Sequence, residues 1–156
     1  MSARASSNAD REIFITRIIN APRNLVFEAW VDSKHADNWM GPAGYKTVTQ
    51  SMDVRAGGTW RFTMTGPQGV FPSRITYIEI VKPSLLIYRH GADKDDDPDA
   101  FDVTVSFEDL GDKTHITMRS LFPSAAARDK VVKEFKAIEG GYQTLEHLEQ
   151  YLLSRR

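Results

Sequence analysis

The change of hydrophobic period near residue 124 is the feature that most constrains the fold of this chain. Between residues 46 and 121, apolar and polar residues alternate over short segments separated by turn residues, which predicts β-strands. From Ser124 onward, apolar residues recur every three or four positions, which predicts one long amphipathic helix over 124–153. Such a helix must bury its apolar stripe, and the apolar faces of the strands are the available partner.

The remaining pattern predicts seven strands and two short helices before the long helix. Pro22 favours a helix start, because its missing N–H has no intrahelical partner at that position. Gly140-Gly141 inside the long helix predicts a kink there or a close approach to another backbone. Strands in one run with segregated helices indicate an α+β fold with a curved antiparallel sheet of six to seven strands. The strands are expected at 12–20, 46–54, 59–65, 71–81, 85–90, 102–108 and 114–121, and the short helices at 22–31 and 34–39.

Length and composition limit the classes of protein to consider. The 156 residues predict one domain, over 12–154, preceded by a disordered polar tail at 1–11. The chain has no cysteine, which excludes disulfides and thiolate metal sites. Its 20 basic and 21 acidic residues give no basic field for nucleic acid. No segment is apolar enough to cross a membrane or to act as a secretory signal, so we expect a cytoplasmic protein without membrane insertion.

The acidic segment 93–99 is the most conspicuous charged feature. Asp93, Asp95 and Asp97 match the first three ligand positions of an EF-hand calcium loop. Pro98 stands where that loop needs glycine, and Thr104 stands where it needs a bidentate glutamate. The pattern therefore predicts a solvated loop and no metal site.

The histidines show no metal-ligand spacing, and no nucleophile motif is present, so no cofactor and no catalytic residue is assigned. His35, His115 and His147 are expected in solvent. His90 ends a strand beside the variable loop 92–100, where it is either a base or ligand donor at a cavity mouth, or a structural histidine. Glu79 lies in an apolar strand. We expect either that this environment shifts the pKa of Glu79 or that Glu79 forms an ion pair with Arg61 or Arg89.

Five segments in order resemble the START-like (SRPBCC) superfamily, and within it the subfamily named for the activator of the heat-shock chaperone ATPase. The resemblance covers about residues 12–153. It implies a helix-grip fold, in which a sheet wraps around the C-terminal helix and encloses a cavity for hydrophobic molecules. The segments are Ala21-Pro22 with Val26-Phe27 and Ala29-Trp30; 39–42 (WMGP); 53–60 (DVRAGGTW); 79–86 (EIVKPSLL); and Gly141-Tyr142 with Leu145, Leu148 and Leu152.

Apolar and polar-tipped residues on the inward faces are either packed core or the lining of such a cavity. Arg74 and Arg89 are either rim cations for an acidic ligand or surface charges of the sheet.

The leading hypothesis is a non-catalytic domain that binds a small hydrophobic molecule. A cyclase-type or hydrolase-type enzyme and a co-chaperone-like interaction module are the alternatives, and a protein partner or homodimer stays open. The cavity candidates are Trp39, Trp60, Phe62, Met64, Tyr77, Tyr88, His90, Phe107, Met118, Phe135 and Tyr142.

Overall fold

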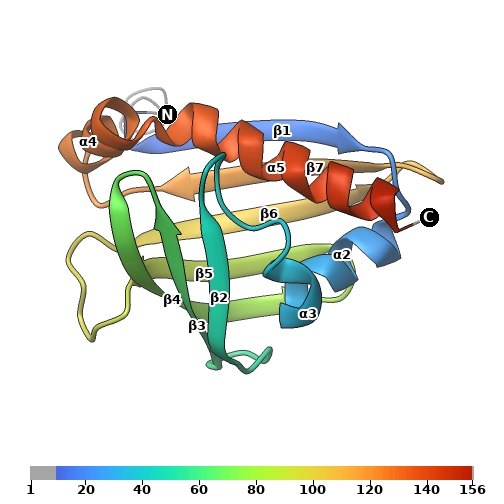
Figure 1. The fold of residues 1–156 in the computed structure, drawn as a ribbon, viewed down its shortest axis with the longest axis horizontal. Helices are drawn as coiled ribbons and strands as arrows, with labels where there is room; N and C mark the ends of the chain where they lie inside the picture. The colour runs from blue at the N-terminus through green and yellow to red at the C-terminus, as the bar shows by residue number, and fades with distance from the viewer. Residues whose placement is uncertain (1–9, 156) are drawn as a thin grey trace, which may run out of the picture.

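The computed structural model describes residues 10–155, which form a seven-stranded antiparallel sheet curved around the C-terminal helix (Figure 1). The strand order is β1-β7-β6-β5-β4-β3-β2, so consecutive strands are neighbours except where the chain crosses from β1 to β2. The predicted α+β architecture is confirmed. The elements are β1 (Glu12–Ile19), α2 (Arg23–Val31), α3 (Ser33–Ala36), β2 (Lys46–Met52), β3 (Thr59–Gly66), β4 (Gly69–Val81), β5 (Leu85–Ala92), β6 (Phe101–Asp109), β7 (Thr114–Leu121), α4 (Ala125–Phe135) and α5 (Ala137–Ser154).

Two β-bulges shift which residues of a strand face inward. In β4 the register shifts between Tyr77 and Glu79, so Tyr77 and then Ile80 pack toward the core. A second shift lies in β2, between Thr49 and Ser51. Bulges bend a strand and increase its twist, which helps the sheet curl. Simple alternation from Tyr77 would turn Glu79 inward, whereas the bulge leaves this residue exposed.

An aromatic cluster fills the end of the molecule covered by α2 and α3. Phe107 of β6 makes edge-to-face contacts with Phe27 at 5.2 Å and with Trp30 at 5.4 Å between ring centroids. Trp39 packs on Trp30 at 4.9 Å and donates a 3.0 Å hydrogen bond from Nε1 to the Ala29 carbonyl. The four rings are almost fully buried. Their packing closes this end of the sheet.

The prediction of one helix over 124–153 is wrong, because the chain breaks it at Lys136. This residue adopts the left-handed conformation, with φ 51° and ψ 49°, between α4 and α5. The spacing of Phe135 and Ile138 continues the apolar period across the break, so periodicity could not reveal it. The break lets α4 lie at the end of α5 away from α2 and α3 (Figure 1). No residue of α4 is fully buried, whereas Leu145 and Leu148 of α5 are.

The glycine pair, which predicted a kink or a close approach to another backbone, instead leaves room for neighbouring side chains. A Cβ on Gly141 would lie 2.1 Å from the Cδ1 atom of Ile15 on β1. A Cβ on Gly140 would lie 3.3 Å from the Pro42 ring. These glycines therefore let the first turn of α5 settle against β1 and the 41–44 turn.

Candidate functional site

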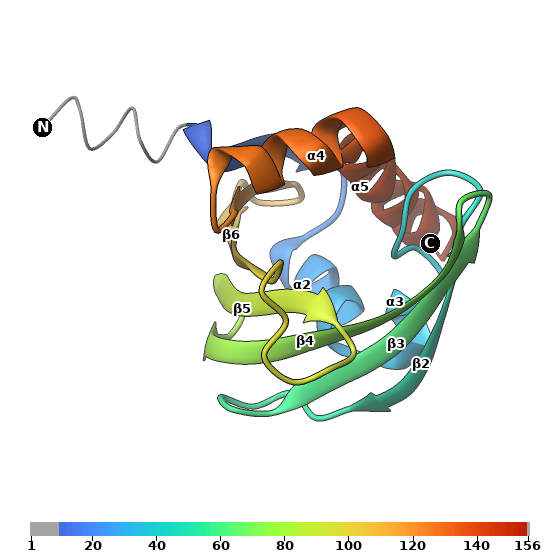
Figure 2. The ribbon, with the colours of Figure 1, turned by 90° about the vertical axis from the view of Figure 1, so that its left-hand side faces the viewer.

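A cavity of about 470 Å³ opens at the end of the molecule opposite α2 and α3. Figure 2 looks toward this end, with α4 on one side and the β5–β6 loop in front. The lining comes from the 42–45 turn, the β3–β4 hairpin, the end of β5, the β5–β6 loop, the start of β6, the end of β7 and α4. The break at Lys136 is thus the feature that places α4 as one wall of this cavity.

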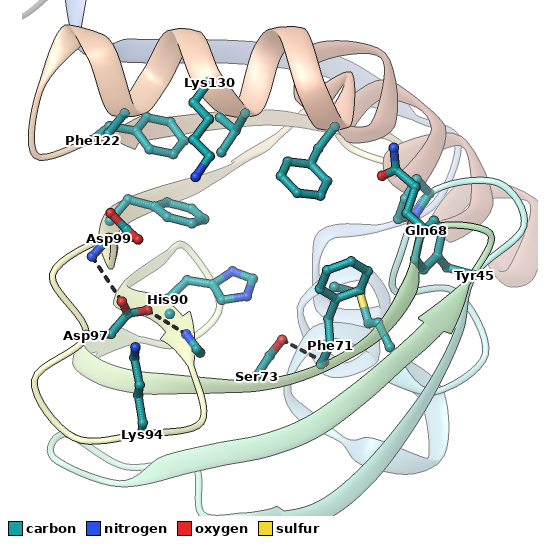
Figure 3. A pocket seen from close by; sticks show the side chains of 18 residues that line it. Tyr45, Gln68, Phe71, Ser73, His90, Lys94, Asp97, Asp99, Phe122 and Lys130 are labelled. Carbon is teal, nitrogen blue, oxygen red and sulfur yellow. Dashed lines mark hydrogen bonds between the residues drawn. The ribbon is translucent and has the colours of Figure 1, made fainter.

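Aromatic rings line two sides of the cavity (Figure 3). Phe101 and Phe122 are stacked, with ring centroids 4.6 Å apart and planes at 25°. Phe71 and Phe135 meet edge to face at 6.0 Å and 88°. Tyr45 extends the second group, at 6.2 Å from Phe71. Two aromatic walls therefore flank one space, with their apolar faces accessible from it.

His90 of β5 is a histidine in the cavity wall (Figure 3). Its ring lies between Phe62, at 5.8 Å, and Phe101, at 5.0 Å. Neither ring nitrogen has a hydrogen-bond partner within residues 10–155. Burial lowers the pKa of His90 from 6.5 to about 4, because the protein environment disfavours the charged imidazolium. At neutral pH the ring is uncharged and offers one donor and one acceptor to the cavity.

His90 predicts a specific dependence of stability on pH. The folded pKa lies below the unfolded value, so between pH 6.5 and about 4 only the unfolded chain takes up this proton. Its contribution is fully present above pH 6.5 and is lost as the pH falls through this window. The His90→Gln variant should lack this loss. The difference in unfolding free energy between wild type and His90→Gln should therefore change by up to about 1.4 kcal/mol per pH unit.

Urea denaturation of wild type and His90→Gln at pH 7, 6 and 5 measures this difference. The lowered pKa values of Asp93 and Glu149 act at lower pH, and both proteins share them. The other three histidines are also common to both proteins. Parallel stability profiles would show that His90 titrates normally.

Charged side chains surround the cavity mouth. Lys130 of α4 points toward the cavity below the helix (Figure 3). Across the cavity from Lys130 lie three charged residues of the β5–β6 loop, Lys94, Asp97 and Asp99. Asp97 accepts hydrogen bonds from the backbone N–H groups of Ala92, at 2.8 Å, and Asp99, at 3.0 Å. These bonds hold the pKa of Asp97 below its usual value and fold the loop over the end of β5.

The acidic loop is anchored as well as solvated. Asp93 binds Arg74 at 3.0 Å and Arg61 at 2.8 Å, and its side chain is only 14% exposed. Asp95 pairs with Arg74 at 2.7 Å. The Arg61 and Arg74 guanidinium groups hold the pKa of Asp93 below its usual range. The loop that bounds the cavity is thus tied to β3 and β4.

The arginines considered as rim cations do not line this cavity. Arg74 is engaged by the acidic loop, and Arg89 pairs with Asp102 at 3.0 Å. The expected ion pair of Glu79 with Arg61 or Arg89 is not formed, because aspartates hold both arginines. The cationic side chains that do line the cavity are Lys130 of α4 and Lys94 of the β5–β6 loop.

The sequence-derived cavity candidates fall into three groups. Met64, His90 and Phe135 line the cavity. Tyr142 of α5 is 42% exposed and lies outside its lining. The others pack in the core, Met118 being only partly buried: Trp39, Trp60, Phe62, Tyr77, Tyr88, Phe107 and Met118.

The tyrosines of the core were expected to offer hydroxyls to a ligand, and they do not line the cavity. Burial raises the pKa of Tyr77 and Tyr88 above the usual value, so both remain protonated. The Tyr77 hydroxyl has no hydrogen-bond partner within the described residues. Tyr77 and Tyr88 face each other across β4 and β5.

Sequence reasoning missed Phe71, Phe101 and Phe122, which form much of the aromatic walls. The available signal was position, because Phe101 begins a strand beside the variable loop and Phe122 directly follows one, before Pro123. Both lie next to the segments that bound an open end of the sheet.

The three histidines expected in solvent are all half-buried and hydrogen-bonded, so this expectation is wrong. Nδ1 of His35 lies 2.6 Å from the Tyr151 hydroxyl, and Nδ1 of His147 lies 3.0 Å from the Gly41 carbonyl. His115 lies on the outer face, 3.1 Å from Glu108. These contacts tie α3 and the 41–44 turn to α5.

Within residues 10–155, no three His, Asp or Glu side chains are grouped to hold a metal ion. In the same part of the chain, no helix has both the length and the apolarity to cross a membrane.

Solved structures share this fold. A protein from Arthrobacter aurescens aligns with a TM-score of 0.84 at 22% identity, covering 94% of this chain and 88% of that one. A Nitrosomonas europaea protein aligns at 0.82 and 20% identity, covering 95% and 97%. A Staphylococcus epidermidis protein aligns at 0.81 and 24% identity, covering 94% and 92%. These identities support a shared fold, the helix-grip fold.

No curated protein matches the sequence at a significant level. The family described as "Activator of Hsp90 ATPase homolog 1-like protein" matches residues 20–153, which span α2, α3, α4, all but the last residue of α5, and six of the seven strands. With its helix-grip architecture and this match over most of its length, the chain belongs to the activator of Hsp90 ATPase homolog 1-like family.

Proposed function

We propose that this protein binds a small hydrophobic molecule in the cavity beside α4. The observation that carries the proposal is the pair of aromatic walls around a space of about 470 Å³. Small-molecule sites commonly enclose about 300–1,000 Å³ and are mostly apolar with a few polar groups. Exposed apolar walls gain roughly 25 cal/mol for each Å² that a ligand removes from water.

His90 supplies the polar group that would orient such a ligand. Its nitrogens have no protein partner in the described structure, so a ligand hydroxyl or carbonyl can bond there without displacing a protein contact. A hydrogen bond in this apolar setting favours ligands that match it over ligands that leave it unpaired.

A titration of ¹⁵N-labelled protein with two neutral probes, 2-naphthol and 1-decanol, tests the proposal. Saturable shifts are expected for backbone amides around the cavity, such as those of Phe71, His90 and Val131. Amides of α2 and α3, at the closed end, serve as the internal control. If neither probe produces saturable shifts at the cavity, the proposal is wrong.

An enzymatic use of the same cavity has weaker support. It rests on His90, since this is the histidine in the wall and no other described side chain hydrogen-bonds to its ring. Efficient general bases have a pKa near the working pH. A histidine whose pKa is about 4 is a weak base at neutral pH, so His90 is better suited to hydrogen-bond a ligand.

A protein-interaction role would need one continuous apolar patch. The large exposed apolar residues are instead spread over separate elements, such as Phe14 and Ile18 on β1, Leu25 on α2 and Val70 on β4. We therefore favour the cavity as the functional site.

A further inference from the structure

The ammonium group of Lys130 is an unpaired cation at the mouth of the cavity. Its side chain descends from α4 toward the space between the aromatic walls (Figure 3). Within the described residues it makes no ion pair within 4.0 Å and no hydrogen bond. A lysine that contacts neither acid nor carbonyl is free to bind an anionic group of a ligand.

The other charges at the mouth leave room for such an anion. Lys94 interacts electrostatically with Asp97, whose oxygens are occupied by two backbone N–H groups. Asp99 is exposed and faces the mouth from the loop, farther from Lys130 than an ion pair allows. Asp99 therefore competes with a ligand anion for the Lys130 charge without neutralising it by contact.

The polar atoms below the mouth include a second donor. Neutral His90 offers one N–H, whereas Ser73 already donates its hydroxyl proton to the Phe71 carbonyl at 3.2 Å. A carboxylate only accepts hydrogen bonds, so Lys130 and His90 suit it. We infer that the ligand is an aromatic carboxylic acid whose carboxylate lies at Lys130, an inference that rests on the proposed function.

The aromatic part of the ligand follows from the walls. A flat ring can stack on or meet the edges of Phe71, Phe101, Phe122 and Phe135, which already pack against one another in these geometries. Aromatic pairs gain from such contacts beyond the area they bury. A flexible acyl chain lacks this gain and loses more rotational freedom when it is bound.

Pairs of ligands that differ mainly in charge or mainly in shape test the two parts of this inference separately. At pH 7.5 and low salt, 2-naphthoate should bind roughly threefold to tenfold more tightly than neutral 2-naphthamide, because it adds a partly exposed charge contact. It should also bind more tightly than decanoate. The Lys130→Met variant keeps the apolar stem and should bind naphthoate and naphthamide equally. Asp99→Asn should strengthen naphthoate binding, because it removes the competing carboxylate.

Lys133→Met is the matched control, since Lys133 is exposed on the same helix and does not line the cavity. It should keep the preference for naphthoate. Equal binding of naphthoate and naphthamide by wild type overturns the carboxylate assignment while the proposed function stands. Tighter binding of 2-naphthylmethylamine than of naphthoate or naphthamide also overturns the carboxylate assignment, because Asp99 would then select a cationic ligand. Stronger binding of decanoate overturns the aromatic assignment. If no probe binds, the proposed function itself fails.

Discussion

Replacing Phe107 by alanine is expected to lower the free energy of unfolding by about 3–5 kcal/mol, the usual cost of deleting a buried aromatic side chain. Phe107 is 1% exposed and contacts Phe27 and Trp30 edge to face, so its removal leaves a cavity between rings that α2 holds in place. Urea denaturation followed by circular dichroism measures the loss. Phe14→Ala is the control, because Phe14 is 47% exposed.

Phe107→Ala also tests whether Phe107 belongs to the packed core or to the ligand cavity. Phe107 does not line the cavity, so folded Phe107→Ala protein should bind 2-naphthol as wild type does. The Phe14→Ala control should lose only about 0.5–1 kcal/mol, through its contact with the Arg119 guanidinium at 5.2 Å. A strong effect of Phe107→Ala on binding at unchanged stability would place the ligand at the closed end and contradict our proposal.

Filling the cavity is the second change with a large expected effect. Ala127 lies on the cavity-facing side of α4, so Ala127→Trp should project its indole into the space that a ligand would use. We expect affinity for 2-naphthol to fall on the order of tenfold or more, because a ligand site requires an open concave space. Stability should change little, since Ala127 is only half-buried and the cavity has room.

Ala126→Trp is the matched control for that experiment. Ala126 is exposed on the same helix and does not line the cavity, so this substitution adds the same side chain facing away from it. Isothermal titration calorimetry on both variants gives the comparison. Equal affinities for Ala127→Trp and wild type would show that the ligand does not occupy the space beside α4.

The strands and the fold class could be predicted because their causes are local. Alternation in segments such as 59–65 and 114–121 reflects one buried and one exposed face of each strand. Those two strands lie at the predicted positions, apart from one added residue at Gly66. The resemblance in five ordered segments then indicated how the elements assemble, and the family match confirms it.

Prediction failed where a position depends on contacts between distant segments. The bulge at Ile78 turns Glu79 outward, and the left-handed Lys136 turns α4 across the open end. Neither position carries a glycine that would mark it in the sequence. Lys136 adopts the left-handed conformation at a cost that the surrounding structure must offset, and the bulge depends on how β4 pairs with β5.

The sequence by itself determined the class of fold and the inward faces of regular strands such as β3 and β7, because the side-chain period follows directly from backbone geometry. Only the tertiary structure decided which inward residues are core and which border a cavity. Trp60 and Met64 lie on the same face of β3, yet Trp60 is buried in the core and Met64 lines the cavity. The difference arises because the closed end is filled by residues of α2 and α3, while α4 stands off from the sheet at the other end.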